Sequence, residues 1–153
     1  AYRTEDSEIF GNMIKEYRTD STIRLQGLRN AMPLDINVTL EKRPPPPNEL
    51  PDHKDELFEF TVRELSFGDR VVARLKTNQH ALMVDHVESA GWAELAGLRQ
   101  GDLLLEIEGN SLRKMSCFKT KMTELNTQQP TRIVFFVQRG IHTLYLELEP
   151  DWQ

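Results

Sequence analysis

Four consecutive prolines, Pro44 to Pro47, interrupt the chain of 153 residues and limit how it can fold. Proline fixes φ and lacks a backbone N–H, so the run favours a stiff polyproline II segment that neither a helix nor a central strand can cross. Such a run can also be a ligand for SH3-type domains. Because it is short and lies between two strand-like segments, we favour a spacer between folded units. We therefore expect an N-terminal segment over residues 1–43, a proline-rich linker over residues 44–56 and a complete domain over residues 57–153.

The composition is that of a globular protein and argues against several kinds of partner. Hydrophobic residues make up 39% and charged residues 28% of the chain, and no apolar run reaches the ~18 residues of a transmembrane helix, so membrane insertion is not expected. The net charge of −5 argues against nucleic acid, because phosphate binding needs a basic face. Cys117 is the single cysteine and the four histidines are scattered. We therefore expect no internal disulfide, no metal site and no cofactor.

Residues 1–43 carry the pattern of one helix followed by two strands. Apolar residues recur at helical spacing near the N-terminus, and the segments 22–28 and 34–41 alternate apolar and polar side chains. The many charges at this end predict no signal peptide, and the start without Met suggests a processed chain or a fragment. One helix and one hairpin bury little apolar surface. We expect residues 7–43 to dock, either on the complete domain or on a second copy as a symmetric homodimer.

The second part of the chain alternates strand and helix patterns. Ser66 and Ser116 are candidate helix caps, and Gly97 is expected to end a short helix in the left-handed conformation. Strands are predicted over residues 57–65, 81–87, 102–107, 133–137 and 143–148. This order predicts a mainly β fold with two or three helices (α+β), arranged as a small antiparallel barrel or sandwich.

The most specific pattern lies between Ser89 and Gly109. Ala-Gly-Leu at residues 96–98 is followed by Gly-Asp at residues 101–102 and then by an apolar strand that ends at a glycine turn. This pattern resembles the signature of PDZ domains. The end of the chain is similar to the closing hairpin of PDZ domains from HtrA-type (Deg) serine proteases. The resemblance implies a PDZ-like fold in the circular order of that family.

Three residues of this pattern have local physical reasons. Gly97 permits a positive φ angle, and Leu98 is expected to fill the core. Asp102 can accept hydrogen bonds from backbone amides of a turn.

The resemblance implies that the domain binds a peptide, usually its C-terminus, as an added strand between one strand edge and one helix. The terminal carboxylate of the peptide would be held by backbone N–H groups of a loop with an apolar-Gly-apolar pattern. The peptide-binding residues that it implies are Phe58, Glu59, Phe60, Thr61 and Val62 on the loop and strand, and Phe118, Met122 and Leu125 on the helix. The three helix residues form one stripe, which can serve the core, the ligand pocket or both.

Glu59 stands where the family pattern has glycine. A side chain at this position resists a positive φ angle, and a carboxylate near the anion pocket repels the terminal charge of a peptide. The alternative is that Glu59 points to solvent from a strand. If binding of a C-terminus is weakened, an extended internal segment or a neighbouring domain becomes the ligand, and the ligand sequence stays open.

The resemblance implies a peptide- or protein-binding PDZ module that recognises substrates for, or regulates, a larger HtrA-like serine protease in a bacterial periplasm or cell envelope. Residues 7–43 look like the C-terminal third of a preceding PDZ domain. The alternative is a structural module for assembly, whose groove is filled by its own N-terminal segment or by another subunit. We expect no enzyme activity in this chain, because Gly-Asn-Ser at residues 109–111 lacks the glycines of a trypsin-like nucleophile motif. No catalytic residue is therefore assigned.

Overall fold

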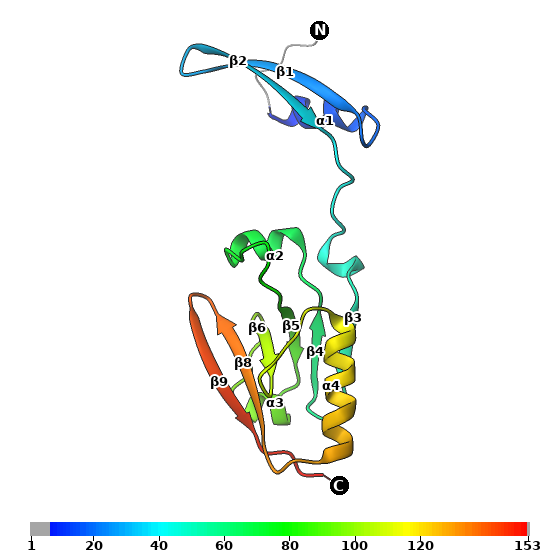
Figure 1. Cartoon of the computed structure of the whole chain (residues 1–153), viewed down its shortest axis with the longest axis vertical. Helices are drawn as coiled ribbons and strands as arrows, with labels where there is room; N and C mark the ends of the chain where they lie inside the picture. The colour runs from blue at the N-terminus through cyan, green and yellow to red at the C-terminus, as the bar shows by residue number, and fades with distance from the viewer. Residues whose placement is uncertain (1–6, 153) are drawn as a thin grey trace. The chain divides into compact units, whose positions relative to one another are not determined.

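The computed structural model describes residues 7–152 and divides the chain into two compact units, Ala1–Pro44 and Pro45–Gln153 (Figure 1). Residues 1–6 of the predicted N-terminal segment lie outside the described residues, as does residue 153. The division falls inside the proline run, where the extended backbone makes few contacts with either side.

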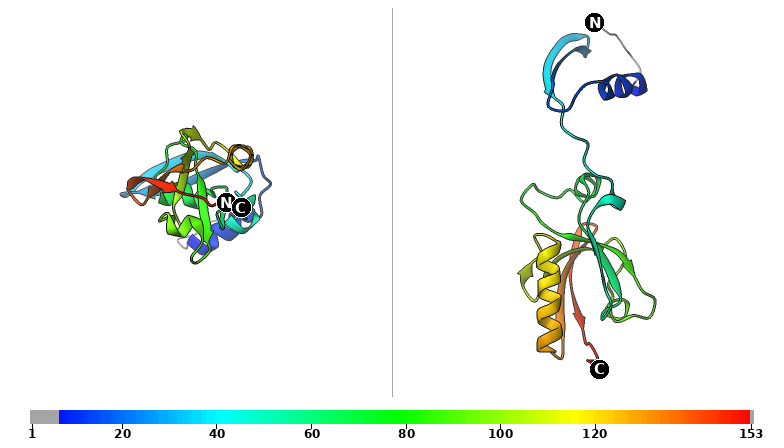
Figure 2. Two further views of the ribbon diagram at one scale, coloured as in Figure 1. Left: turned by 90° about the horizontal axis from the view of Figure 1, so that it is seen from below. Right: turned by 90° about the vertical axis from the view of Figure 1, so that its right-hand side faces the viewer.

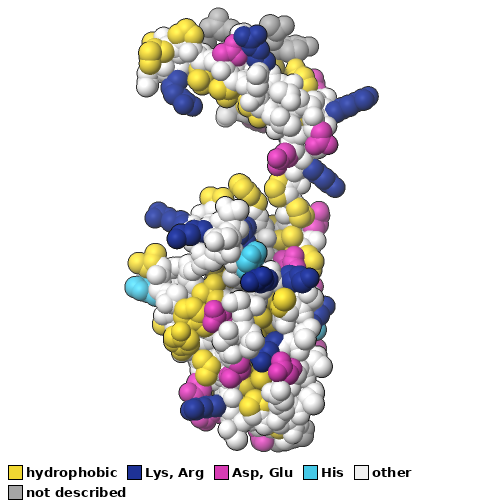
Figure 3. Space-filling view, viewed as in Figure 1, with side chains coloured by type: hydrophobic (Ala, Val, Ile, Leu, Met, Phe, Trp, Pro, Cys, Tyr) yellow, Lys and Arg dark blue, Asp and Glu magenta, His cyan; other side chains and the backbone are white. Residues whose placement is uncertain are grey.

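The first unit consists of helix α1 (Ser7–Lys15) and a hairpin of strands β1 (Thr22–Arg29) and β2 (Met32–Thr39). The two strands are antiparallel and join through a two-residue turn in which both residues have positive φ angles, 53° and 63°. The predicted helix and strands are thus present. No residue of α1 is buried, and apolar side chains reach the surface of this unit (Figure 3).

The second unit is built on one antiparallel sheet in the order β3-β4-β5-β6-β8-β9, with β7 paired to β6 (Figures 1 and 2). Its strands are β3 (Asp52–Asp55), β4 (Phe60–Arg63), β5 (Leu82–Val87), β6 (Leu103–Ile107), β7 (Asn110–Ser111), β8 (Ile133–Arg139) and β9 (His142–Leu148). Its helices are the 3-10 helix η1 (Pro47–Glu49) and the α-helices α2 (Phe67–Val72), α3 (Trp92–Leu95) and α4 (Met115–Gln128). The predicted class, mainly β with helices and an antiparallel sheet, is confirmed.

One main core holds this unit together between the sheet and α4. Its large, fully buried side chains come from the loop before β4, from five strands, from α4 and from the segments between them. Leu98 is 1% exposed, as its place after the Gly97 helix stop predicts, and Gly97 has a φ angle of 90°. A smaller cluster of Ala81, Leu103 and Leu105 packs under the segment that contains α2.

Two predicted helix caps have different outcomes. Ser66 caps α2 in a capping box, in which its side chain accepts a hydrogen bond from the Asp69 N–H while the Asp69 carboxylate accepts one from the Ser66 N–H. The Ser116 cap is wrong, because α4 already begins at Met115 and its N-cap residue is Lys114.

The segment before β4 differs most from the prediction. The expected strand 57–65 is a strand only over Phe60–Arg63, because residues 56–59 form the turn that joins β3 to β4. The expected linker 44–56 contains η1 and β3 and belongs to the second unit from Pro45 onward. The sequence Asp-His-Lys-Asp of β3 has no apolar residue, so hydrophobic alternation gives no signal for this strand.

Candidate peptide groove between β4 and α4

The loop before β4 holds Glu59 in the left-handed conformation, with a φ angle of 60°. Glu59 thus adopts this angle although its side chain disfavours it. Backbone hydrogen bonds fix the conformation: the Glu59 N–H donates to the Asp55 carbonyl at 3.0 Å, and the Glu88 N–H donates to the Glu59 carbonyl at 2.9 Å. The loop thus has a positive φ angle at the position where the family pattern described above has glycine.

The Glu59 side chain lies over Gly91, on the α3 side of the loop. A β-carbon added to Gly91 would lie 2.9 Å from a carboxylate oxygen of Glu59. Gly91 therefore leaves the space into which the Glu59 side chain fits. This contact joins two distant positions of the sequence and could not be predicted from their spacing.

Most of the predicted peptide-binding residues lie in the core. Phe58, Phe60, Val62 and Phe118 are fully buried, and Met122 and Leu125 are 6% and 2% exposed. Thr61 is half-buried and Glu59 is exposed. Their role in ligand binding stays a prediction. Because the six apolar side chains support the fold, charged substitutions at these positions would unfold the domain as well as alter a groove.

The structure brings the strand and helix residues of this set together. The rings of Phe60 and Phe118 meet edge to face, with centroids 5.9 Å apart, and Phe60 also contacts Phe135 at 5.8 Å. β4 and α4 therefore share one aromatic contact, which sets the distance between the strand edge and the helix.

β3 lies along the edge of β4 that faces away from β5. The pairing is antiparallel, with His53 opposite Val62 and Asp55 opposite Phe60, and the Glu64 N–H extends it by donating to the Pro51 carbonyl at 2.9 Å. The His53 ring meets the Phe118 ring of α4 edge to face, with centroids 5.9 Å apart. The chain's own residues 51–55 thus occupy the β4 edge and reach α4 (Figure 2).

Asp55 places a carboxylate against the loop before β4. It accepts a hydrogen bond from the Phe58 N–H at 2.8 Å and is 8% exposed. Burial raises the pKa of Asp55, and the hydrogen bond from Phe58 opposes this effect. The N–H group of Phe58 belongs to the loop in which the resemblance implies that a terminal carboxylate is held.

Arg63, at the end of β4, joins three elements. Its guanidinium contacts Asp69 of α2 at 2.7 Å and Asp85 of β5 at 3.0 Å, and it donates to the Glu64 carbonyl at 3.0 Å. Hydrogen bonding from Arg63 lowers the pKa of Asp69 to about 2. This network anchors α2 to the strand that forms the groove.

Asp102 of the Gly-Asp motif joins the motif to the closing hairpin. Asp102 is 1% exposed, and its carboxylate accepts a hydrogen bond from the Arg99 N–H at 2.9 Å, as predicted. It also forms a bidentate ion pair with Arg139, in which each of the two hydrogen bonds is 2.7 Å long. Arg139 also donates to the Gly97 carbonyl at 2.8 Å. The partner Arg139 lies 37 residues away in the sequence, so spacing alone could not identify it.

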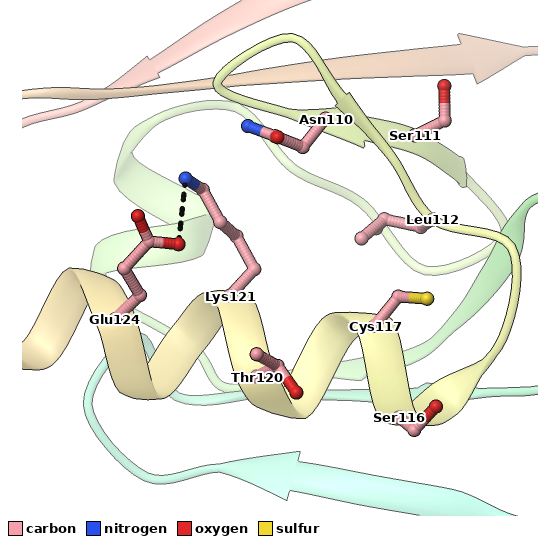
Figure 4. Close-up of a pocket in the computed structure, with 8 residues that line it drawn as sticks. All are labelled: Asn110, Ser111, Leu112, Ser116, Cys117, Thr120, Lys121 and Glu124. Carbon is pink, nitrogen blue, oxygen red and sulfur yellow. Dashed lines mark hydrogen bonds and ion pairs between the residues drawn. The ribbon is translucent and has the colours of Figure 1, made fainter.

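A second hollow, of about 350 Å³, lies on the other side of α4, between the helix and β7 (Figure 4). It is lined by Asn110, Ser111, Leu112, Ser116, Cys117, Thr120, Lys121 and Glu124. Lys121 and Glu124 form an ion pair across 3.2 Å. The Asn110 side chain donates to the Glu108 carbonyl at 2.9 Å, in keeping with the turn predicted at residues 109–110.

Residues 7–152 also bear on metal binding and membrane insertion. No group of three or more His, Cys, Asp or Glu side chains among them is placed to hold a metal ion. Within the same range, no helix has the length and apolar character needed to cross a bilayer.

Comparison with known proteins gives a likeness in structure only. No protein family matches the sequence, and no curated protein does so either. Among solved structures, the chain is similar to the HtrA3 PDZ domain in a crystal structure bound to a phage-derived ligand (FGRWV). The identity is 17% and the TM-score is 0.48, over 66% of this chain and 89% of that one.

Proposed function

We propose that the unit Pro45–Gln153 is a peptide-binding module of the PDZ type, which takes an extended segment as a strand along β4 beside α4. One observation carries this proposal: residues 51–55 already lie on that edge as an antiparallel strand. The edge therefore accepts an extended backbone, and main-chain hydrogen bonds would supply much of the affinity for a peptide.

Side-chain selection would come from two places in the groove. The ring of Phe118 contacts the ring of His53 and would take an aromatic or imidazole side chain of a ligand. The Phe58 N–H holds a carboxylate and would take the terminal or side-chain carboxylate of a ligand. Glu59 directs its own carboxylate toward Gly91, which reduces its repulsion of this charge.

The test is a selection of peptides with free and blocked C-termini on the full chain, followed by titration against two variants. Phe118→Leu keeps an apolar side chain but removes the ring that faces the groove, so we expect binding to weaken about tenfold, which corresponds to about 1.4 kcal/mol. Phe135→Leu is the matched control, because Phe135 is equally buried and also contacts Phe60 but lies on β8. Equal effects of the two substitutions, or no selected peptide at all, would contradict the proposal.

A structural role for the same unit is the second candidate, and the presence of β3 in the groove favours it. In that case the groove would be filled permanently, and the module would serve assembly. Hydrogen exchange of the β3 amides separates the two functions. The amides of a permanent strand would exchange only when the whole domain unfolds, whereas those of a removable strand would exchange faster.

The wider role is proposed on the sequence resemblance. We propose that the module recognises substrates for, or regulates, an HtrA-like serine protease in a bacterial periplasm or cell envelope, and that residues 7–43 are the end of a preceding PDZ domain. The sequence of the complete coding region tests this directly. We expect it to encode a serine protease domain and the remainder of that PDZ domain, and a coding region without either would contradict the proposal.

A further inference from the structure

Residues 52–55 have the placement of a bound peptide although they are part of the chain. His53 and Asp55 are two residues apart and therefore lie on one face of β3, toward Phe118 and the Phe58 N–H. Lys54 lies on the other face, where it pairs with Glu88 at 3.4 Å. Burial follows the same alternation, since Asp52 and Lys54 are exposed while His53 is half-buried and Asp55 is buried.

We infer that β3 is a tethered ligand of the groove, which a peptide in trans must displace from β4. We further infer that such a peptide carries an aromatic or imidazole ring two residues before a carboxyl group. This inference rests on the proposed function, because it assigns the ligand class and the regulation of the same groove.

The composition of β3 makes its displacement feasible. β3 brings no aliphatic side chain into the main core, whose buried members come from other segments. Release therefore exposes little apolar surface, in contrast to the loss of a strand such as β8. Burial raises the pKa of Asp55, because removing its carboxylate from water is unfavourable, and this desolvation opposes docking of the strand.

The covalent connection explains how so short a strand can hold the groove. β3 is joined to β4 by only the four residues of the turn 56–59. A tether of this length gives an effective concentration of the order of millimolar, so β3 competes with peptides even if its intrinsic affinity is low. Free peptides should therefore bind the unaltered chain weakly and a chain with released β3 more strongly.

The probe is a fluorescent peptide with the sequence of residues 48–55, ending in a free carboxylate at Asp55, titrated against full-length variants. In the released variant, His53→Pro, proline removes a backbone N–H and disfavours strand pairing. In the locked variant, Lys54→Cys with Thr61→Cys joins two positions that face each other in the pairing, in a Cys117→Ser background. The control lock, Gln138→Cys with Thr143→Cys, joins facing positions of β8 and β9 in the same background.

We expect His53→Pro to raise the affinity for the probe at least tenfold. Oxidation of the β3–β4 lock should abolish binding and reduction should restore it, while oxidation of the control lock should change nothing. A matched peptide with alanine in place of His53 and Asp55 and with an amidated C-terminus, which has neither the ring nor a carboxyl group at this end, should not bind. Circular dichroism establishes that each variant keeps its fold.

Three results would overturn the inference or its basis, and they differ from one another. If the oxidised lock binds the probe as well as its reduced form, β3 does not compete for the site. If the alanine peptide binds as tightly as the probe, the ligand class is wrong. If neither the probe nor any selected peptide binds the folded His53→Pro variant, the proposed peptide-binding function itself is wrong.

Discussion

At the scale of single residues, the ion pairs of the second unit decide its response to acid. Hydrogen bonding from Arg63 lowers the pKa of Asp69 from 3.8 to about 2. A carboxylate whose pKa is lower in the folded state stabilises the fold above pH 3.8 and loses this contribution as the pH falls toward 2. The pair is largely shielded, with side-chain exposures of 12% and 16%.

We therefore predict that Arg63→Gln lowers the free energy of unfolding at pH 7 by about 1–2 kcal/mol and flattens its decline between pH 4 and pH 2. Urea unfolding at several pH values measures both effects. Arg24→Gln is the control, because the Arg24–Asp35 pair also lowers an aspartate pKa to about 2 but is exposed on the first unit. An unchanged acid profile for Arg63→Gln would contradict the assignment.

Asp102 gives a second prediction at this scale. Its buried carboxylate joins the Arg99 N–H to Arg139, so Asp102→Ala would leave both donors without their partner. We expect a loss of about 3–5 kcal/mol, the usual effect of breaking a buried pair. Thermal unfolding measures it, with Glu106→Ala, at a half-buried position on β6, as the comparison. A loss no larger than that of Glu106→Ala would show that the motif carboxylate is dispensable.

At the scale of elements, the sequence predicts the helices and strands that are held by packing of apolar side chains. It does not predict a strand that is held by backbone hydrogen bonds. The apolar stripe of α4 and the Ala-Gly-Leu pattern predicted the helix and the burial of Leu98, because both depend on hydrophobic periodicity. β3 could not be predicted, since it is held by pairing with β4 and by two polar side chains. The peptide-binding role of the candidate residues on β4 and α4 stays a prediction.

The structure of Glu59 illustrates a related limit. The free-energy cost of a positive φ angle at a residue other than glycine is small compared with the stabilisation from the two backbone hydrogen bonds of Glu59 and its packing against Gly91. We predict that Gly91→Val lowers the free energy of unfolding of the unit by about 1–3 kcal/mol, because the valine side chain would collide with Glu59. The double variant Gly91→Val with Glu59→Gly should recover part of this loss, and the absence of recovery in urea unfolding would contradict the contact.

At the scale of the whole molecule, the order of elements in the first unit is the same as at the end of the second unit. α1, β1 and β2 follow one another as α4, β8 and β9 do, and both hairpins close through two residues, between Arg29 and Met32 and between Arg139 and His142. The other edge of β8 pairs with β6. Within the part of the chain that the structure describes, β1 has only β2 as a partner.

This open edge and the exposed apolar side chains of the unit, among them Leu28 at 74% and Met32 at 66%, lead us to predict association of the full chain. Light scattering should give the mass of a dimer for the full chain and of a monomer for a version that begins at Pro45. If the full chain is monomeric and proteases remove residues 1–43 at once, the segment does not mediate a homodimer.

The central claim is that the β4 edge beside α4 binds an extended peptide, and NMR shift mapping tests it most directly. We would titrate the His53→Pro variant with the peptide of residues 48–55 and follow every backbone amide. We expect the largest changes on the loop before β4, on β4 and on the face of α4 around Phe118, with β9 unaffected. Changes centred on β9 or on the hollow beside Cys117, with β4 silent, would contradict it.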